Sequence, residues 1–281
     1  MLPTLKVFDL VWKSLIDEII SGGVKVSPRG NLTLEIPQKT ISVDMRFPVL
    51  VNSKRSLSYK FMAAEALWIL TGDNRVESIA KYNSRIREFS DDGVTFFGAY
   101  GPRIATQLDY VITKLRSDPD TRQAGLTIWR ENPPATKDVP CTVAIFFNIR
   151  QDQINCHVFM RSSDAWLGVP YDVFNFSMLS YAVCNYLNNA VGEAKYSPGM
   201  LHLTAASSHL YSHNIEDARI CLHEDIQASI DQLKRPPDCL YNGKRRNTIL
   251  MDSLHQIRES RPGDACRWWL TGILGNEHET E

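Results

Sequence analysis

The sequence lacks the features that would place a protein in a membrane, on nucleic acid or outside the cell. No apolar run approaches the roughly 20 residues of a membrane-spanning helix. An early aspartate, Asp9, interrupts the start, which therefore does not follow the pattern of a signal peptide. The net charge of −1 gives no general attraction to nucleic acid or to an anionic membrane. We expect a cytoplasmic protein that binds neither nucleic acid nor membranes.

Cysteine pairs are missing too. The six cysteines include no C-x-x-C motif and no zinc-type spacing, so we expect reduced thiols and no metal site. Because free cysteine packs like a small apolar residue, most of them are expected in the core. Their positions are Cys141, Cys156, Cys184, Cys221, Cys239 and Cys266.

Linkers, repeats and low-complexity segments are also absent, which predicts one domain over residues 1–281 with a tail beyond about 268 that is loosely held. With 281 residues, 43% of them hydrophobic, the chain can bury a large core. Apolar periodicity predicts helices over 6–20, 56–70, 76–89, 104–118, 172–187 and 215–233, and strands over 31–36, 41–47, 124–129, 143–149, 154–160 and 200–206. This pattern indicates an α+β fold in which a mixed or mostly antiparallel sheet packs against helices.

One cysteine lies in a setting that favours chemistry. Cys141 follows Pro140 at the start of an apolar strand, where a thiol can face a ligand. A cysteine acts as a nucleophile only as a thiolate, which needs positive charge or hydrogen bonds nearby. A lone cysteine at a strand end is more often structural, so this position alone does not decide between the two.

The segment 160–172 offers an anion site. Arg161 with Ser162 and Ser163 combines a forked guanidinium with two hydroxyls, which suits a phosphate. Arg29 and Arg122 lie in other loops, where surface ion pairing is the ordinary interpretation. Asp172 follows a Gly-Val-Pro-Tyr turn at the first turn of a helix, as a helix cap would.

Three further side chains remain ambiguous by pattern. Glu65 lies among apolar residues of a predicted helix, an unusual place for a carboxylate unless it is on the solvent face. His209 and Tyr211 follow a predicted strand and could donate to sugar hydroxyls or simply pack there.

Together these residues resemble the thymidylate synthase superfamily over about 29–211. The motifs that carry the resemblance, in order, are 64–73 (AEALWILTGD), 101–102 (GP), 118–122 (DPDTR), 139–141 (VPC), 161–164 (RSSD), 167–170 (LGVP) and 208–212 (SHLYS). The resemblance implies a sheet-mediated homodimer that transfers a one-carbon unit from 5,10-methylenetetrahydrofolate to carbon 5 of a pyrimidine nucleoside monophosphate.

The resemblance also implies roles for individual residues. Cys141 is the nucleophile that adds to carbon 6 of the base, and Glu65 manages proton transfers through water. The residues implied to bind the nucleotide are Arg29, Arg161, Ser162 and Ser163, with His209 and Tyr211 at the sugar and Arg122 reaching the phosphate from the other subunit. Those implied to bind the folate are Ile86, Asp164, Leu167, Gly168 and Tyr171.

Four departures from the family pattern carry information. Thr142 replaces the histidine after the nucleophile, Gln123 replaces one of two paired arginines, and Ile104 stands where a tyrosine is expected. Asp172 replaces the asparagine that reads the base. Thr142 and Asp172, with the Met-Arg-Ser sequence before Ser163, resemble the deoxycytidylate hydroxymethylases of phage-type nucleotide metabolism.

Asp172 favours cytosine on chemical grounds. Cytosine presents an amino donor and an unprotonated ring nitrogen, which a protonated carboxyl matches by accepting from one and donating to the other. An ionised carboxylate would instead meet the carbonyl of uracil with no proton to share. Burial can raise the pKa of an aspartate enough to keep that proton.

We therefore expect a deoxycytidylate 5-hydroxymethyltransferase, located in the host cytoplasm if the chain is viral. The sequence leaves open whether water or hydride completes the reaction, and so a dCMP 5-methyltransferase is the close alternative. Ribose against deoxyribose is open as well, which leaves a CMP hydroxymethylase. A dUMP-using thymidylate synthase and a catalytically inactive nucleotide- or RNA-binding relative are the remaining alternatives.

Overall fold

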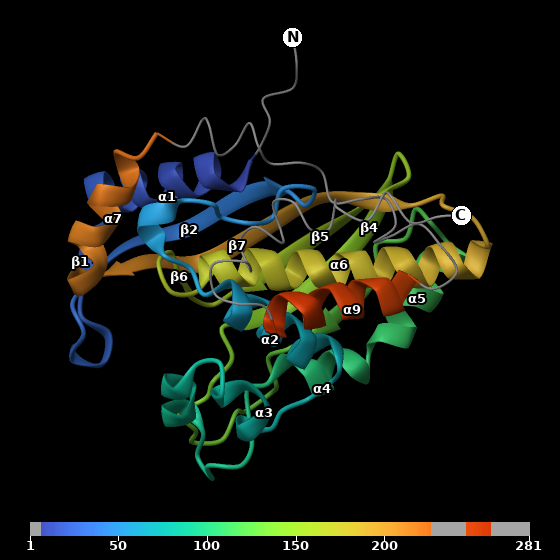
Figure 1. Cartoon of the computed structure of the whole chain (residues 1–281), viewed down its shortest axis with the longest axis horizontal. Coiled ribbons are helices and arrows are strands. Elements are labelled where there is room, and N and C mark those ends of the chain that lie inside the picture. Colours follow the sequence, from blue (N-terminus) through green and yellow to red (C-terminus); the bar gives the residue numbers. More distant parts are fainter. Residues whose placement is uncertain (1–6, 226–245, 260–281) are drawn as a thin grey trace.

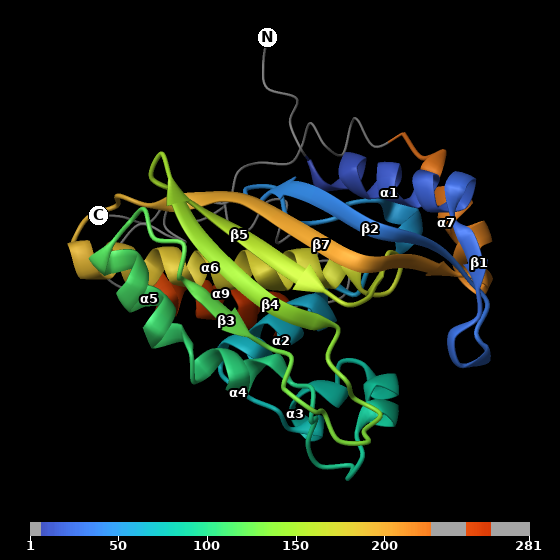
Figure 2. The ribbon, with the colours of Figure 1, turned by 180° about the vertical axis from the view of Figure 1, so that it is seen from behind.

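A computed structural model describes residues 7–225 and 246–259 of the chain. A seven-stranded sheet, in the order β1-β2-β7-β5-β4-β3 with β6 paired to β7, forms one layer (Figures 1 and 2). The long helix α6 (Val169–Val191) runs across one face of this sheet, with α2 (Tyr59–Leu70) and α9 (Arg246–Glu259) beyond it. The predicted α+β class is therefore confirmed.

The centre of the sheet is built from three long strands. β4 (Thr142–Arg150) and β5 (Gln153–Met160) form an antiparallel hairpin, and β5 then pairs in parallel with β7 (Ser197–Tyr211). Alternate residues of these strands are buried against α6, as the period of two predicted. The short strands β3 (Gly125–Thr127) and β6 (Ser163–Asp164) complete the sheet.

The second strand is longer than the sequence pattern indicated. β2 (Thr33–Asp44) is one continuous strand paired with β7, where two strands over 31–36 and 41–47 had been predicted. Pro37 and Gln38 break the apolar alternation, but β1 (Val24–Val26) covers β2 only opposite residues 33–35. Beyond that point β2 is an edge strand on that side, where a proline without an N–H group is tolerated.

The helices differ from their predicted bounds mainly at their ends. α1 (Phe8–Gly22) matches the first prediction closely, and α2 begins after Ser58, whose hydroxyl accepts from the Phe61 N–H, rather than at Ser56. The predicted helix over 76–89 is α3 (Val76–Ala80) followed by a separate 3₁₀ turn at Ser84–Phe89. The predicted helix over 104–118 is split into α4 (Tyr100–Ala105) and α5 (Leu108–Ser117).

The C-terminal part gives the remaining differences. α7 (Ile215–Leu222) ends well before residue 233, and the end of that prediction lies outside the described residues. α9 had no predicted counterpart, and the tail beyond about 268, which was predicted to be loosely held, lies outside the described residues. None of the helices described is long and apolar enough to cross a membrane.

Cysteine burial agrees with the sequence-based expectation where it can be read. Cys156, Cys184 and Cys221 are buried, and Cys141 is half-buried. Cys239 and Cys266 lie outside the described residues. Cys141 therefore differs from the other three thiols in keeping access to solvent.

Candidate active site

The strand order brings Cys141 and Arg161 together. Cys141 immediately precedes β4 and Arg161 immediately follows β5, so the hairpin places both at the same end of the sheet. The Arg161 N–H donates to the Cys141 carbonyl at 2.9 Å. The Arg161 guanidinium also donates from Nε to the Pro140 carbonyl and from Nη2 to the Val139 carbonyl, at 3.0 and 2.9 Å. These bonds fix the guanidinium beside the cysteine and leave its other N–H groups available to an anion.

The two serines after Arg161 are not equivalent. Ser162 is half-buried and its hydroxyl lies 3.3 Å from Nδ1 of His209, across the β6–β7 pairing. Ser163 is only 2% exposed, and its hydroxyl oxygen has no hydrogen-bond partner in the structure. The structure therefore brings Ser162 and His209 together, whereas Ser163 is set into the protein behind them.

Two more predicted residues lie at this end of the sheet. His209 and Tyr211 belong to β7 itself, not to a loop after it, and their rings meet edge to face at 5.3 Å. Thr33 pairs with Tyr211, so the loop before β2 that carries Arg29 starts beside them. Arg29 is exposed in that loop, with a positive φ of 53°.

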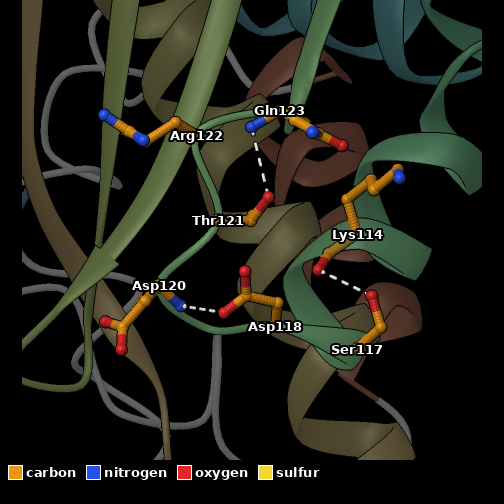
Figure 3. A pocket seen from close by; sticks show the side chains of 7 residues that line it. All are labelled: Lys114, Ser117, Asp118, Asp120, Thr121, Arg122 and Gln123. Atoms are coloured by element: carbon orange, nitrogen blue, oxygen red, sulfur yellow. Dashed lines mark hydrogen bonds between the residues drawn. The ribbon is translucent and has the colours of Figure 1, made fainter.

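Arg122 lies far from Cys141 in the same chain. The Phe147 N–H donates to the Ala124 carbonyl, which sets the segment before β3 beside the distal part of β4. Six residues of strand separate Phe147 from Cys141, or roughly 20 Å at about 3.4 Å per residue. Arg122 borders a shallow polar pocket of about 330 Å³, where its side chain and that of Gln123 point in opposite directions (Figure 3).

Asp172 is not a helix cap. Gly168 is the N-cap of α6 and Asp172 lies inside the first turn, donating its N–H to the Gly168 carbonyl. A methyl group at Gly168 would lie 3.2 Å from Oδ2 of Asp172, so the missing side chain leaves room for this carboxyl group. The helix-cap interpretation was therefore wrong, because the Asp172 carboxyl group does not cap α6.

Two carboxyl groups face each other across α2 and α6. Glu65 is half-buried and not on an exposed solvent face, and Nδ2 of Asn175 donates to its Oε2 at 2.8 Å. Burial raises the pKa of Glu65 to about 7, although the Asn175 bond opposes that change. Burial, followed by repulsion from Glu65 and Asp164, raises the pKa of Asp172 to about 8. Near neutral pH the Asp172 carboxyl group is therefore protonated.

The Cys141 thiol is not activated in advance. Burial raises its pKa, the charge of Arg161 lowers it, and the charge of Asp172 raises it again. The nucleophile therefore gains its negative charge most easily while Asp172 is protonated. The structure therefore places both the positive charge of Arg161 and the acidic Asp172 near the thiol.

Tyr100 was missed by the sequence analysis. Its hydroxyl accepts from the Thr142 hydroxyl at 3.0 Å and from the Thr142 N–H at 3.3 Å, directly beside the nucleophile. Burial, with repulsion from Asp172 and Cys141, raises its pKa, so it stays a neutral donor. Ile104, where a tyrosine was sought, is 3% exposed in the core. Tyr100 directly precedes the Gly101-Pro102 motif, and an aromatic residue at that position was the feature of the sequence that could have indicated its role.

The residues predicted on the folate side fall into two groups. Ile86 and Tyr171 are half-buried and pack on a second apolar cluster with Phe61 and Trp68, whose buried Nε1 has no partner. Aromatic surface with a spare N–H donor fits a flat heterocycle such as a pterin.

The second group is the turn before α6. Asp164 accepts from the N–H groups of Trp166 and Leu167 at 2.8 and 2.9 Å, and so it stabilises the turn that leads to Gly168. Leu167 is 53% exposed. This turn presents an apolar side chain to solvent on a rigid support.

Comparison with known proteins decides the family. The family model described as thymidylate synthase matches residues 11–241. The chain belongs to the thymidylate synthase family. A deoxyuridylate hydroxymethyltransferase of Bacillus phage SP01 is 28% identical over 305 residues, covering 94% of this chain and 78% of the relative.

Membership gives this protein its general activity. It is a transferase that moves a one-carbon unit to a pyrimidine nucleotide, with methylenetetrahydrofolate as cosubstrate. Within residues 7–225 and 246–259, no group of three or more His, Cys, Asp or Glu side chains could hold a metal ion.

Proposed function

We propose that this protein transfers the one-carbon unit to carbon 5 of dCMP and that water addition yields 5-hydroxymethyl-dCMP. The observation that carries the choice of base is Asp172, whose pKa of about 8 supports a protonated carboxyl group at neutral pH. Such a group accepts from the cytosine amino group and donates to the ring nitrogen. The ionised form of the carboxyl group would leave the uracil carbonyl without a donor, at a cost of about 1–3 kcal/mol.

Each side chain around Cys141 has a separate role in the proposed reaction. Cys141 adds to carbon 6 as electron density moves toward the ring nitrogen, where the Asp172 proton stabilises it. Glu65, ionised above its pKa of about 7, accepts protons from water near the base. Neutral Tyr100 donates a hydrogen bond beside the nucleophile while Thr142 holds its oxygen in place.

The nucleotide and the folate bind on opposite sides of the side chains around Cys141. Arg161 and Ser162 bind the 5′-phosphate with Arg29, and His209 and Tyr211 contact the sugar, whereas the buried Ser163 lies behind this site. Ile86, Tyr171 and the turn formed by Asp164, Leu167 and Gly168 hold the folate, which supplies the one-carbon unit.

A second copy of the chain completes the phosphate site. Arg122 is roughly 20 Å from the Cys141 end of its own sheet, too far to reach a phosphate bound there. The face of β4, β5 and β7 opposite α6 has no described helix over it (Figure 2). Phe146 and Phe159 are 40% and 45% exposed on that face. We infer that two sheets stack there in a homodimer and that each Arg122 serves the other subunit.

A second candidate is hydroxymethylation of dUMP, which the printed name of the phage relative favours. It requires the protonated Asp172 carboxyl group to turn over, so that it donates to the uracil carbonyl and accepts from the ring N–H. A hydride-completed reaction that gives 5-methyl-dCMP keeps the same base and changes only the last step.

Product analysis separates these possibilities. The protein would be incubated with methylenetetrahydrofolate and dCMP, dUMP or CMP in turn, and the nucleotides analysed by mass spectrometry. A hydroxymethyl gain on dCMP supports the proposal. Modification of dUMP alone would refute it, and a methyl gain on dCMP would support the base and reject the last step.

A further inference from the structure

Asn175 has an unusual position relative to the two carboxyl groups. It lies three residues after Asp172, so both side chains leave α6 on the same face. It is 5% exposed, and Nδ2 donates to Oε2 of Glu65 at 2.8 Å. Its other polar atom, Oδ1, is buried and has no hydrogen-bond partner in the structure.

An unpaired buried carbonyl oxygen is costly. Leaving such an acceptor unsatisfied costs about 1–3 kcal/mol, and so a buried amide oxygen beside a reacting group indicates a ligand that donates to it. Water bound inside proteins typically has two to four polar partners. The Glu65 carboxylate and the Asn175 carbonyl provide two such acceptors on adjoining helices.

We propose that Asn175 positions Glu65 through its N–H group and, through Oδ1, binds the water that completes hydroxymethyl transfer. This inference rests on the proposed function. The same bond opposes the rise in the pKa of Glu65, so Asn175 also keeps the base ionised. Asn175 is thus a positioning residue that favours water over hydride in the last step.

The step balances as follows. The nucleotide, bound to Cys141 through carbon 6, carries an exocyclic methylene on carbon 5. The water oxygen forms a bond to the methylene carbon, and one water proton passes to the Glu65 carboxylate. The electron pair of the carbon–carbon double bond moves into the ring toward carbon 4. Its return re-forms the carbon 5–carbon 6 double bond and expels the Cys141 thiolate. The products are the hydroxymethyl nucleotide, the free thiolate and protonated Glu65.

Two variants separate the two tasks of the amide. Asn175→Ala removes both the donor and the acceptor, whereas the isosteric Asn175→Asp removes the donor and keeps an acceptor oxygen. Asn185→Ala is the matched control, because Asn185 is a fully buried asparagine of α6 whose amide also has no partner. It lies ten residues further along, or about 15 Å at about 1.5 Å per residue.

The assay follows product identity and kcat from pH 5.5 to 9 with dCMP and methylenetetrahydrofolate. We expect the acidic limb of the pH profile, near 7 in the parent, to move upward in both Asn175 variants. The hydroxymethyl share of the product should fall at least about tenfold in Asn175→Ala and less in Asn175→Asp, with KM for dCMP changed by less than about threefold. Asn185→Ala should leave the limb and the product unchanged.

Several results would overturn the inference. An unmoved acidic limb in both Asn175 variants rejects the positioning of Glu65, and an unchanged product share in Asn175→Ala rejects the water site. Equal losses in Asn175→Ala and Asn185→Ala would mean general damage to α6 rather than a local role. If the parent itself forms no hydroxymethyl product, the proposed function fails first, and the pH limb still tests the contact with Glu65.

Discussion

The two ends of the nucleotide site are built in different ways. At the base end, Glu65, Asp172 and Asn175 lie on two packed helices, and burial raises the pKa of both carboxyl groups. At the phosphate end, only Arg161 is fixed beside Cys141, while Arg29 is exposed in a loop and Arg122 is at the far end of the sheet. One chain therefore contains the proposed base chemistry, whereas the phosphate site that we propose would draw Arg122 from a second copy.

Substitution of the nucleophile, Cys141, should have the largest effect on activity. Cys141→Ser should lower kcat by roughly 10⁴-fold or more, because a serine hydroxyl beside Arg161 is not ionised. Binding of dCMP, measured by calorimetry, should stay within about threefold because the phosphate and base contacts remain. Turnover close to that of the parent protein would remove Cys141 from its role.

Glu65→Gln tests the base end twice. We expect kcat to fall about 10²–10⁴-fold through loss of the general base. The free energy of unfolding should instead increase in the variant at alkaline pH. In the parent, the folded-state pKa of Glu65 is raised from 4.5 to about 7, and so the folded protein loses stability as the pH rises between those values.

The neutral amide avoids that loss. At pH 8 the variant should therefore be more stable than the parent by up to about 3 kcal/mol, and near pH 4 the two should unfold at similar denaturant concentrations. Denaturant titration at the two pH values checks this, and a difference that is the same at both would count against a buried, titrating Glu65.

Arg122→Glu tests the phosphate end. A lost charged contact costs about 1.5–3 kcal/mol, and so kcat/KM should fall by roughly 10–100-fold or more, with most of the change in KM. Mixing this variant with Cys141→Ser subunits should restore activity, because a mixed dimer would contain one site with both an intact Cys141 and an intact partner arginine. Mixtures as inactive as the separate variants would contradict the sharing of sites.

Thr142→Val gives the smallest expected effect. It removes the hydroxyl contact to Tyr100 but keeps the main-chain contact, and so kcat should fall by less than about tenfold. A loss as large as that of Glu65→Gln would mean that the threonine hydroxyl itself takes part in the reaction.

The sequence predicted the elements that carry local patterns. The hairpin around Cys141 and Arg161 followed from the period of two, and the buried helix after Asp172 followed from its apolar faces. The long strand β2 was divided because Pro37 and Gln38 interrupt the pattern at an edge that only the sheet order reveals. The start of α2 after Ser58 depends on a capping contact that several nearby residues could have made.

The missed site residues depend on contacts between distant segments. Asn175 looked like one polar residue in an apolar helix, and only the packing of α2 on α6 reveals Glu65 as its partner. Tyr100 acquires a role because its hydroxyl meets Thr142, 42 positions along the chain. Asp172 could be predicted from the chemistry of cytosine, but its proton depends on burial and on the nearby Glu65.

The central claim is that a protonated Asp172 selects cytosine, and the base preference of Asp172→Asn tests it most directly. The ratio of kcat/KM for dCMP to that for dUMP would be measured at pH 7 for the parent and the variant. We predict that the parent favours dCMP and that the variant lowers the ratio by about 10–100-fold, with dUMP becoming the better substrate. An unchanged ratio, or a parent that already prefers dUMP, would contradict the account.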